Sequence, residues 1–130
     1  MNRSIPTLLG PAETVRIFQH QSELKKFAAG DTIYQEDQPG DLMYGILDGE
    51  VELFVNQKRI ATLKAGGVFG IRALIYEDGL RDSTAIAKTD CTLAYLDRQR
   101  FYFTVQETPM FALNVMRSYS ERLRYLKQMI

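Results

Sequence analysis

Short apolar segments separated by turn residues dominate the chain from Lys25 to Asp97. The segments are rich in β-branched and aromatic residues, and Gly, Asn or Asp punctuates them roughly every eight to twelve positions, which is typical of an all-β domain. A flat sheet of this size would leave edges and one face uncovered, so the pattern predicts a rolled or sandwiched β-structure. The segments expected to form strands are TIYQE, LMYGIL, VELFV, RIATL, STAIA and TLAYL.

Helices are expected at both ends of this β-region. The segment AETVRIFQHQSEL favours a short N-terminal helix, and Asp97 is a suitable N-cap for a helix that follows it. Thr108 and Pro109 form an N-cap and a first helical position for a long helix that runs to Ile130. We therefore predict one mainly β domain over residues 1–130. Its parts are an N-terminal segment (1–23), a jelly-roll β-roll (24–97) and C-terminal helices (98–130).

The long C-terminal helix carries an apolar seam with a heptad-like spacing. Such a seam either packs on the helix's own roll or pairs with the same helix of a second copy. The regular spacing favours the second interpretation and predicts a homodimer. The seam residues are Ala112, Met116, Tyr119, Leu123, Leu126 and Ile130.

Composition excludes several classes of function. The formal net charge is zero, which argues against nucleic-acid binding because a basic face is needed to neutralise phosphates. No apolar run is long enough to cross a bilayer and no leader pattern opens the chain, so we expect a cytoplasmic protein. Cys91 and His20 are each the only residue of their type, so neither a disulfide nor a metal cluster is expected. Without paired carboxylates or a nucleophile beside a base, we predict no enzymatic activity.

Two single residues have specific interpretations. Cys91, followed by Thr, Leu and Ala, is expected to be a buried strand thiol. Gly45 lies inside an apolar segment where no turn is needed, so it marks a bulge, a close backbone approach or a weak strand position.

The motifs of the β-region resemble those of the cyclic nucleotide-binding domain family. The pattern F-x-x-G-x-x-I-x-x-x-x-x-x-G-D-x-M-Y runs from Phe27 to Tyr44, G-E-V-E-L starts at Gly49, and G-G-x-F-G starts at Gly66. The segment ALIY and Arg81 continue the resemblance. It implies a β-roll sensor domain, here in a stand-alone form that ends without room for a helix-turn-helix domain.

The resemblance also implies an anion site within residues 66–85. In that family a short helix after F-G presents backbone N–H groups to the cyclic phosphate, together with one arginine. Arg81 would be that arginine; the alternative is an exposed ion pair with Glu77 or Asp78. The candidate ligand-binding residues are Phe69, Gly70, Ile71, Arg72, Ala73, Arg81, Asp82 and Ser83.

Two of these residues depart from the family pattern. Ile71 replaces the glutamate that accepts a hydrogen bond from the ribose and would form an apolar wall. Asp82 replaces a small residue, and a carboxylate about 4 Å from a phosphate adds a repulsion of roughly 4 kcal/mol at intermediate dielectric. Unless Asp82 points away, as neighbours in an extended segment do, these changes argue against tight binding of cyclic AMP or GMP.

The sequence therefore predicts a non-enzymatic sensor whose occupied pocket acts on the final helix. A cyclic nucleotide is one candidate ligand. Another is a small anion such as a dicarboxylate, for which Arg72 beside Arg81 would be suited if Arg72 is not simply a surface residue. The alternative function is a ligand-free module that holds an unidentified protein partner.

Overall fold

The computed structural model describes residues 10–130, so the first nine residues of the predicted N-terminal segment lie outside the described part. Two four-stranded antiparallel sheets have the strand orders β1-β8-β3-β6 and β2-β7-β4-β5. This confirms the predicted mainly β jelly-roll with helices at its ends. The elements are α1 (Pro11–Phe18), β1 (Lys25–Phe27), β2 (Thr32–Tyr34), β3 (Leu42–Asp48), β4 (Val51–Val55), β5 (Lys58–Leu63), β6 (Val68–Phe69), α2 (Arg72–Ile75), β7 (Thr84–Ala87), β8 (Cys91–Asp97), α3 (Arg98–Glu107) and α4 (Pro109–Lys127).

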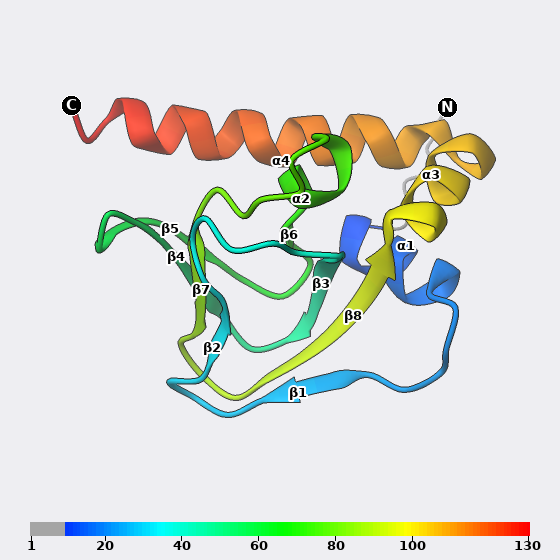
Figure 1. Ribbon diagram of the computed structural model, residues 1–130, viewed down its shortest axis with the longest axis horizontal. Coiled ribbons are helices and arrows are strands. Elements are labelled where there is room, and N and C mark those ends of the chain that lie inside the picture. Colours follow the sequence, from blue (N-terminus) through cyan, green and yellow to red (C-terminus); the bar gives the residue numbers. More distant parts are fainter. Residues whose placement is uncertain (1–9) are drawn as a thin grey trace, which may run out of the picture.

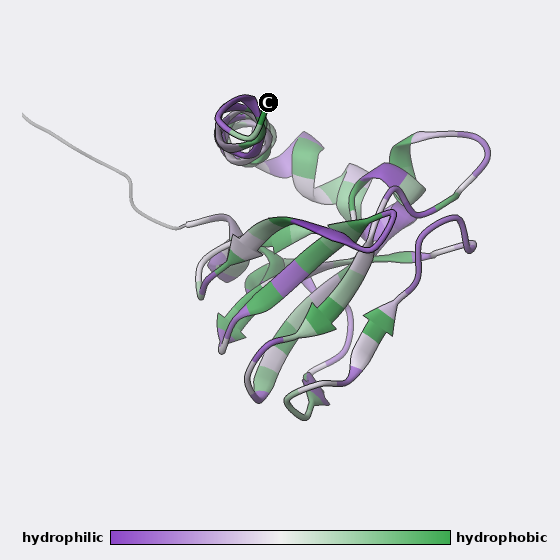
Figure 2. Cartoon of the chain, turned by 90° about the vertical axis from the view of Figure 1, so that its left-hand side faces the viewer, coloured by the Kyte–Doolittle hydropathy of each residue, from purple (hydrophilic) through white to green (hydrophobic). Residues whose placement is uncertain are grey.

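The helices gather at one end of the roll. Figure 1 shows α4 running across the top of the molecule with α2 beneath it and α1 and α3 to one side. Figure 2 looks along α4 and shows that it lies above the strands.

The core has two parts because the sheet β1-β8-β3-β6 is covered on both faces. Alternate residues of a strand point to opposite faces, so in β3 Tyr44 joins the cluster inside the roll while Met43 joins the cluster beneath the helices. The strand β8 divides in the same way, with Leu93 inside the roll and Leu96 beneath the helices. Cys91 is buried inside the roll, which confirms its prediction.

Gly45 marks a close backbone approach. A Cβ atom at this position would lie 2.8 Å from the Cα atom of Ala12 in α1. Of the three interpretations left open by the sequence, the structure therefore selects the contact with a neighbouring backbone. Gly45 allows α1 to pack directly on β3.

The helix ends agree with the predicted caps in part. The Asp97 carboxylate accepts a hydrogen bond from the Arg100 amide at 2.8 Å, as expected for an N-cap. Thr108 is at once the C-cap of α3 and the N-cap of α4, and its side chain makes no capping hydrogen bond. The prediction that the last helix continues to Ile130 was wrong, because α4 ends at Lys127.

Candidate ligand-binding site

The predicted anion loop connects β6 to α2. Gly70 has a φ of +85°, a conformation that residues with a side chain rarely adopt, and a Cβ atom here would lie 2.9 Å from Arg81 Nη1. Phe69 is fully buried inside the roll. Ile71 is buried among the core residues beneath the helices. It is therefore part of the core and does not form the apolar cavity wall that the sequence suggested.

Arg81 is buried and its guanidinium points into the protein. Only 4% of the residue is exposed, and its guanidinium lies 4.0 Å from the centre of the Tyr34 ring. Nη1 donates to the Gly70 carbonyl at 2.9 Å, whereas the buried Nε has no partner within the described residues. The alternative of an exposed ion pair with Glu77 or Asp78 was wrong.

Arg72 forms the ion pair of this loop instead. Its guanidinium donates two hydrogen bonds to the Asp78 carboxylate, at 2.7 and 3.0 Å, and a third to the Leu80 carbonyl at 2.9 Å. The hydrogen bonds from Arg72 are the main cause that lowers the pKa of Asp78 to about 2. Arg72 also stacks on Tyr76, at 4.2 Å from the ring centre. The Arg72 side chain is thus engaged within its own loop and is not available to an acidic ligand.

A cavity of about 230 Å³ lies between the roll and α4. Asp82 lines it and Arg81 does not. Ser83 is buried, and its hydroxyl donates to Asp82 Oδ1 at 3.2 Å. The lining residues from the roll are Tyr34, Leu53, Ile60, Gly70, Asp82 and Ser83, and those from α4 are Tyr119, Arg122, Leu123 and Leu126.

Tyr34 is a site residue that the sequence analysis missed. It stacks against Tyr44 and Phe69 as well as against Arg81. Burial is the main cause that raises the pKa of its hydroxyl well above the usual value, so Tyr34 stays neutral. A tyrosine in a β-segment is an ordinary strand residue, and nothing in the sequence around it signals a contact with Arg81.

The helix α4 contacts the anion loop directly. The Ile71 amide donates to the Tyr119 hydroxyl at 3.4 Å, and Arg122 donates to the Val68 carbonyl. The guanidinium of Arg122 also stacks on Tyr119, at 4.2 Å from the ring centre. One of the amides predicted to hold an anion is therefore occupied by a hydroxyl from α4.

The predicted seam of α4 divides between two surroundings. Tyr119 and Leu126 turn toward the roll and line the cavity. Met116 and Leu123 are 60% and 66% exposed, and Ile130 beyond the helix is fully exposed. Ala112 is half-buried. The seam thus contributes both to the cavity wall and to an exposed apolar face.

The opposite end of α2 is tied to α3. Arg98 donates to the Leu74 carbonyl at 2.8 Å and to the Ala73 carbonyl at 3.0 Å, and the Tyr102 hydroxyl donates to Leu74 at 3.3 Å. These bonds satisfy carbonyls that a helix end leaves free. The same bonds connect α2 to α3, which is followed through Thr108 by α4.

Residues 10–130 contain no group of His, Cys, Asp and Glu side chains able to hold a metal ion. Over the same residues, no helix is both long and apolar enough to span a membrane.

A two-sheet roll with a glycine-framed loop, a buried arginine and a cavity beside α4 defines a jelly-roll domain with a candidate ligand site. The chain belongs to the cyclic nucleotide-binding domain family, because that family's model matches residues 24–108.

Individual relatives agree with this assignment. The chain is 37% identical over 79 residues to a cAMP-dependent protein kinase regulatory subunit of Eremothecium gossypii, and 34% identical over 76 residues to a cGMP-dependent protein kinase of Plasmodium berghei. These matches cover 61% and 58% of this chain but only 17% and 9% of the relatives. The solved catabolite activator protein of Thermus thermophilus has the same fold, with a TM-score of 0.73 at 22% identity over 92% of this chain and 56% of that one.

Proposed function

We propose that the protein is a non-enzymatic regulatory module in which occupancy of the cavity is coupled to the position of α4. The observation that carries this proposal is that α4 supplies one wall of the cavity and contacts the anion loop through Tyr119 and Arg122. A ligand shifts α4 only if it binds one of its positions better than another. A ligand that needs the Ile71 amide competes with Tyr119 and therefore meets this condition.

The charges of the cavity argue against tight binding of a cyclic phosphate. Asp82 lines the cavity, whereas the guanidinium of Arg81 is held by Tyr34 and the Gly70 carbonyl. The other charged residue of the lining, Arg122, is engaged with the Val68 carbonyl. A phosphate near Asp82 meets a repulsion of up to roughly 4 kcal/mol at intermediate dielectric. Cyclic AMP, cyclic GMP and small dicarboxylates remain the candidate ligands, and we expect weak binding of all three unless Arg81 turns toward the cavity.

A ligand screen followed by amide hydrogen exchange tests the coupling. Ligands are first found by a rise in melting temperature, with cyclic AMP, cyclic GMP, succinate and 2-oxoglutarate as probes. We expect any ligand of the cavity to change the exchange of amides in residues 115–126. The cavity-filling variant Ile60→Trp shows whether a ligand occupies the cavity, because it should abolish the binding of such a ligand. A ligand that meets this test but leaves the amide exchange of α4 unchanged contradicts the coupling.

The exposed part of the seam supports a homodimer through α4. Met116, Leu123 and Ile130 recur every seven residues and are exposed, as expected for residues that pair with a second helix. We expect sedimentation to show a dimer that Leu123→Glu converts to a monomer. The matched variant Lys127→Glu changes charge on the same helix and leaves a dimer intact.

One observation favours a second candidate function, a ligand-free module that binds a protein. The Arg81 guanidinium packs on the Tyr34 ring, and the Ile71 amide donates to the Tyr119 hydroxyl. Both groups that would hold a ligand are therefore already engaged. If no probe changes the melting temperature, this function replaces the first. A cytoplasmic location remains a prediction from the sequence.

A further inference from the structure

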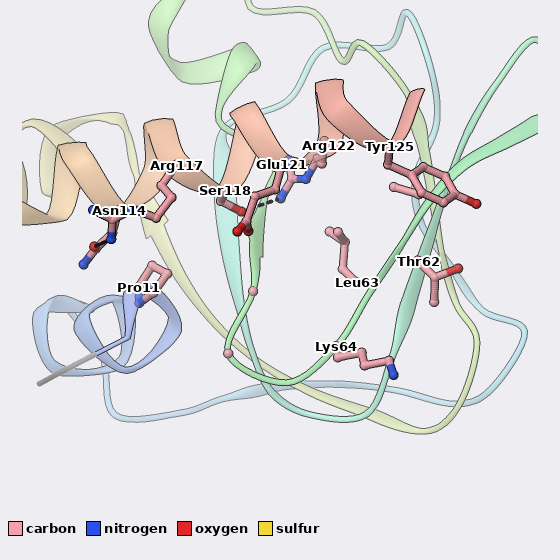
Figure 3. A pocket seen from close by; sticks show the side chains of 13 residues that line it. Pro11, Thr62, Leu63, Lys64, Asn114, Arg117, Ser118, Glu121, Arg122 and Tyr125 are labelled. Atoms are coloured by element: carbon pink, nitrogen blue, oxygen red, sulfur yellow. Dashed lines mark hydrogen bonds between the residues drawn. The ribbon is translucent and has the colours of Figure 1, made fainter. Parts of the chain in front are cut away.

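A second and larger cavity flanks α4 on its other side. This groove of about 520 Å³ lies between α4 and the end of β5, with Pro11 and the turn at Gly66 and Gly67 at its border. Figure 3 shows Thr62, Leu63 and Lys64 on one side and the α4 side chains on the other, with open space between them. Arg122 is the one residue that lines both this groove and the ligand cavity.

The groove is bordered by the edge of β5. The sheet order β2-β7-β4-β5 makes β5 an edge strand, so within residues 10–130 one side of its backbone has no neighbouring strand. Four consecutive residues, Ala61 to Lys64, line the groove. Because successive side chains of a strand point to opposite faces, a run of four lining residues means that the groove follows the strand edge. Edge N–H and C=O groups are a template for an added strand.

The charged side chains around the groove are mostly basic. Lys64, Arg117 and Arg122 line it together with one acid, Glu121. Among the described residues, none of these three cations takes part in an ion pair. Arg122 is engaged with the Val68 carbonyl and Ser118 Oγ, and the contact of Arg117 with Asn114 is long at 3.4 Å. Lys64 and Arg117 are therefore the cations available to an acidic partner.

We propose that this groove binds an extended acidic segment of a partner protein, which adds as a strand to the edge of β5. The main chain of the segment pairs with residues 61–63 at the end of β5, and its carboxylates face Lys64 and Arg117 on opposite sides. Three strand residues span about 10 Å, and with the flanking residues that reach the two cations a core of about four to five residues is expected to determine binding. The Tyr125 side chain, which borders the groove, provides an aromatic surface for an apolar residue of the segment.

Peptide display followed by calorimetry tests this proposal. A random eight-residue library is selected on the full chain, and we expect the selected peptides to be acidic. N-methylation of alternate backbone amides in a selected peptide is expected to weaken binding about tenfold or more, because added strands bind through main-chain hydrogen bonds. This arm leaves the protein unchanged, so a folding defect cannot imitate the result.

Charge-reversal variants locate the peptide. Arg117→Glu is expected to weaken binding about fivefold to tenfold, while Lys26→Glu, an exposed change on β1 in the other sheet, leaves it unchanged. Amide shifts on binding should concentrate in residues 61–64. Absence of selected peptides, equal binding by Arg117→Glu and wild type, or insensitivity to N-methylation each overturns the proposal. None of these measurements needs a ligand in the other cavity, so their failure leaves the proposed sensor function untouched.

Discussion

The two cavities on either side of α4 differ in charge, and the difference is the reverse of what the sequence motifs predict. The cavity that carries the family's anion loop presents Asp82, while its arginine is buried against Tyr34. The groove along β5 has no such motif and presents Lys64 and Arg117. A motif thus locates a loop, whereas the side-chain directions decide which charge a ligand meets.

The largest expected effect comes from removing the buried arginine. Arg81→Ala leaves the Gly70 carbonyl without its donor and removes the packing on Tyr34, which should lower the free energy of unfolding by about 2–4 kcal/mol. Urea denaturation measures this loss. The control Arg72→Ala removes a solvent-accessible ion pair and should cost much less, because water screens such pairs. Equal losses would mean that Arg81 is no more deeply engaged than Arg72.

The next effect concerns the carboxylate that faces the ligand cavity. Asp82→Ser removes the repulsion and restores a small residue, so the affinity for cyclic AMP should rise about tenfold. Calorimetry of both variants at one ionic strength measures the change. The control Glu77→Ser alters an exposed acid of the same loop that does not line the cavity. An equal rise in that variant would show that general charge, and not Asp82, limits binding.

A smaller effect is expected where α4 meets the anion loop. Tyr119→Phe removes the hydroxyl that accepts from the Ile71 amide and should cost about 0.5–1 kcal/mol, because the bond is long and partly exposed. Faster hydrogen exchange of the Ile71 amide would report its loss. Tyr125→Phe, on the groove side of α4, serves as the control. Unchanged exchange at Ile71 would show that Tyr119 does not hold this amide.

The smallest effect is the acid dependence of the loop that precedes Arg81. The pKa of Asp78 is lowered from 3.8 to about 2 by Arg72, so the native state favours the ionised carboxylate. Its contribution to stability is complete above about pH 4 and is lost as the pH falls toward 2. Proton exchange and chemical shifts of residues 76–80 should follow this loss, and Asp78→Asn should remove the dependence. A loop that titrates in the same way without Asp78 contradicts the assignment.

Much of the fold was predictable because strand periodicity and turn residues are local signals. The six predicted strand segments correspond to β2, β3, β4, β5, β7 and β8. The strands β1 and β6 were missed because segments of three and two residues are too short to show an alternation. The cap at Asp97 was found for the same local reason, since it needs only a carboxylate three residues before an amide.

The candidate site was less predictable because its geometry depends on distant parts of the chain. The direction of Arg81 is set by Tyr34, which lies in the distant strand β2, and by the space left at Gly40, where a Cβ atom would overlap the guanidinium. The seam of α4 shows the same limit. Its spacing cannot distinguish a residue that lines the ligand cavity, such as Leu126, from one that is exposed and lines neither cavity, such as Met116.

A single residue, Thr108, separates α3 from α4, so a change in its backbone angles would tilt α4 as one rigid rod. Thr108 caps both helices without a side-chain hydrogen bond, and Pro109 has no amide hydrogen to bridge them. The 19 residues of α4 form an arm of about 28 Å. A tilt of about 10° at Thr108 would move Tyr119 by about 3 Å and the far end of the arm by about 5 Å, since displacement grows with distance along the helix. If the cavity is coupled to α4 as proposed, a small change in the backbone angles of Thr108 would be enough to alter both cavities, because α4 lines each of them.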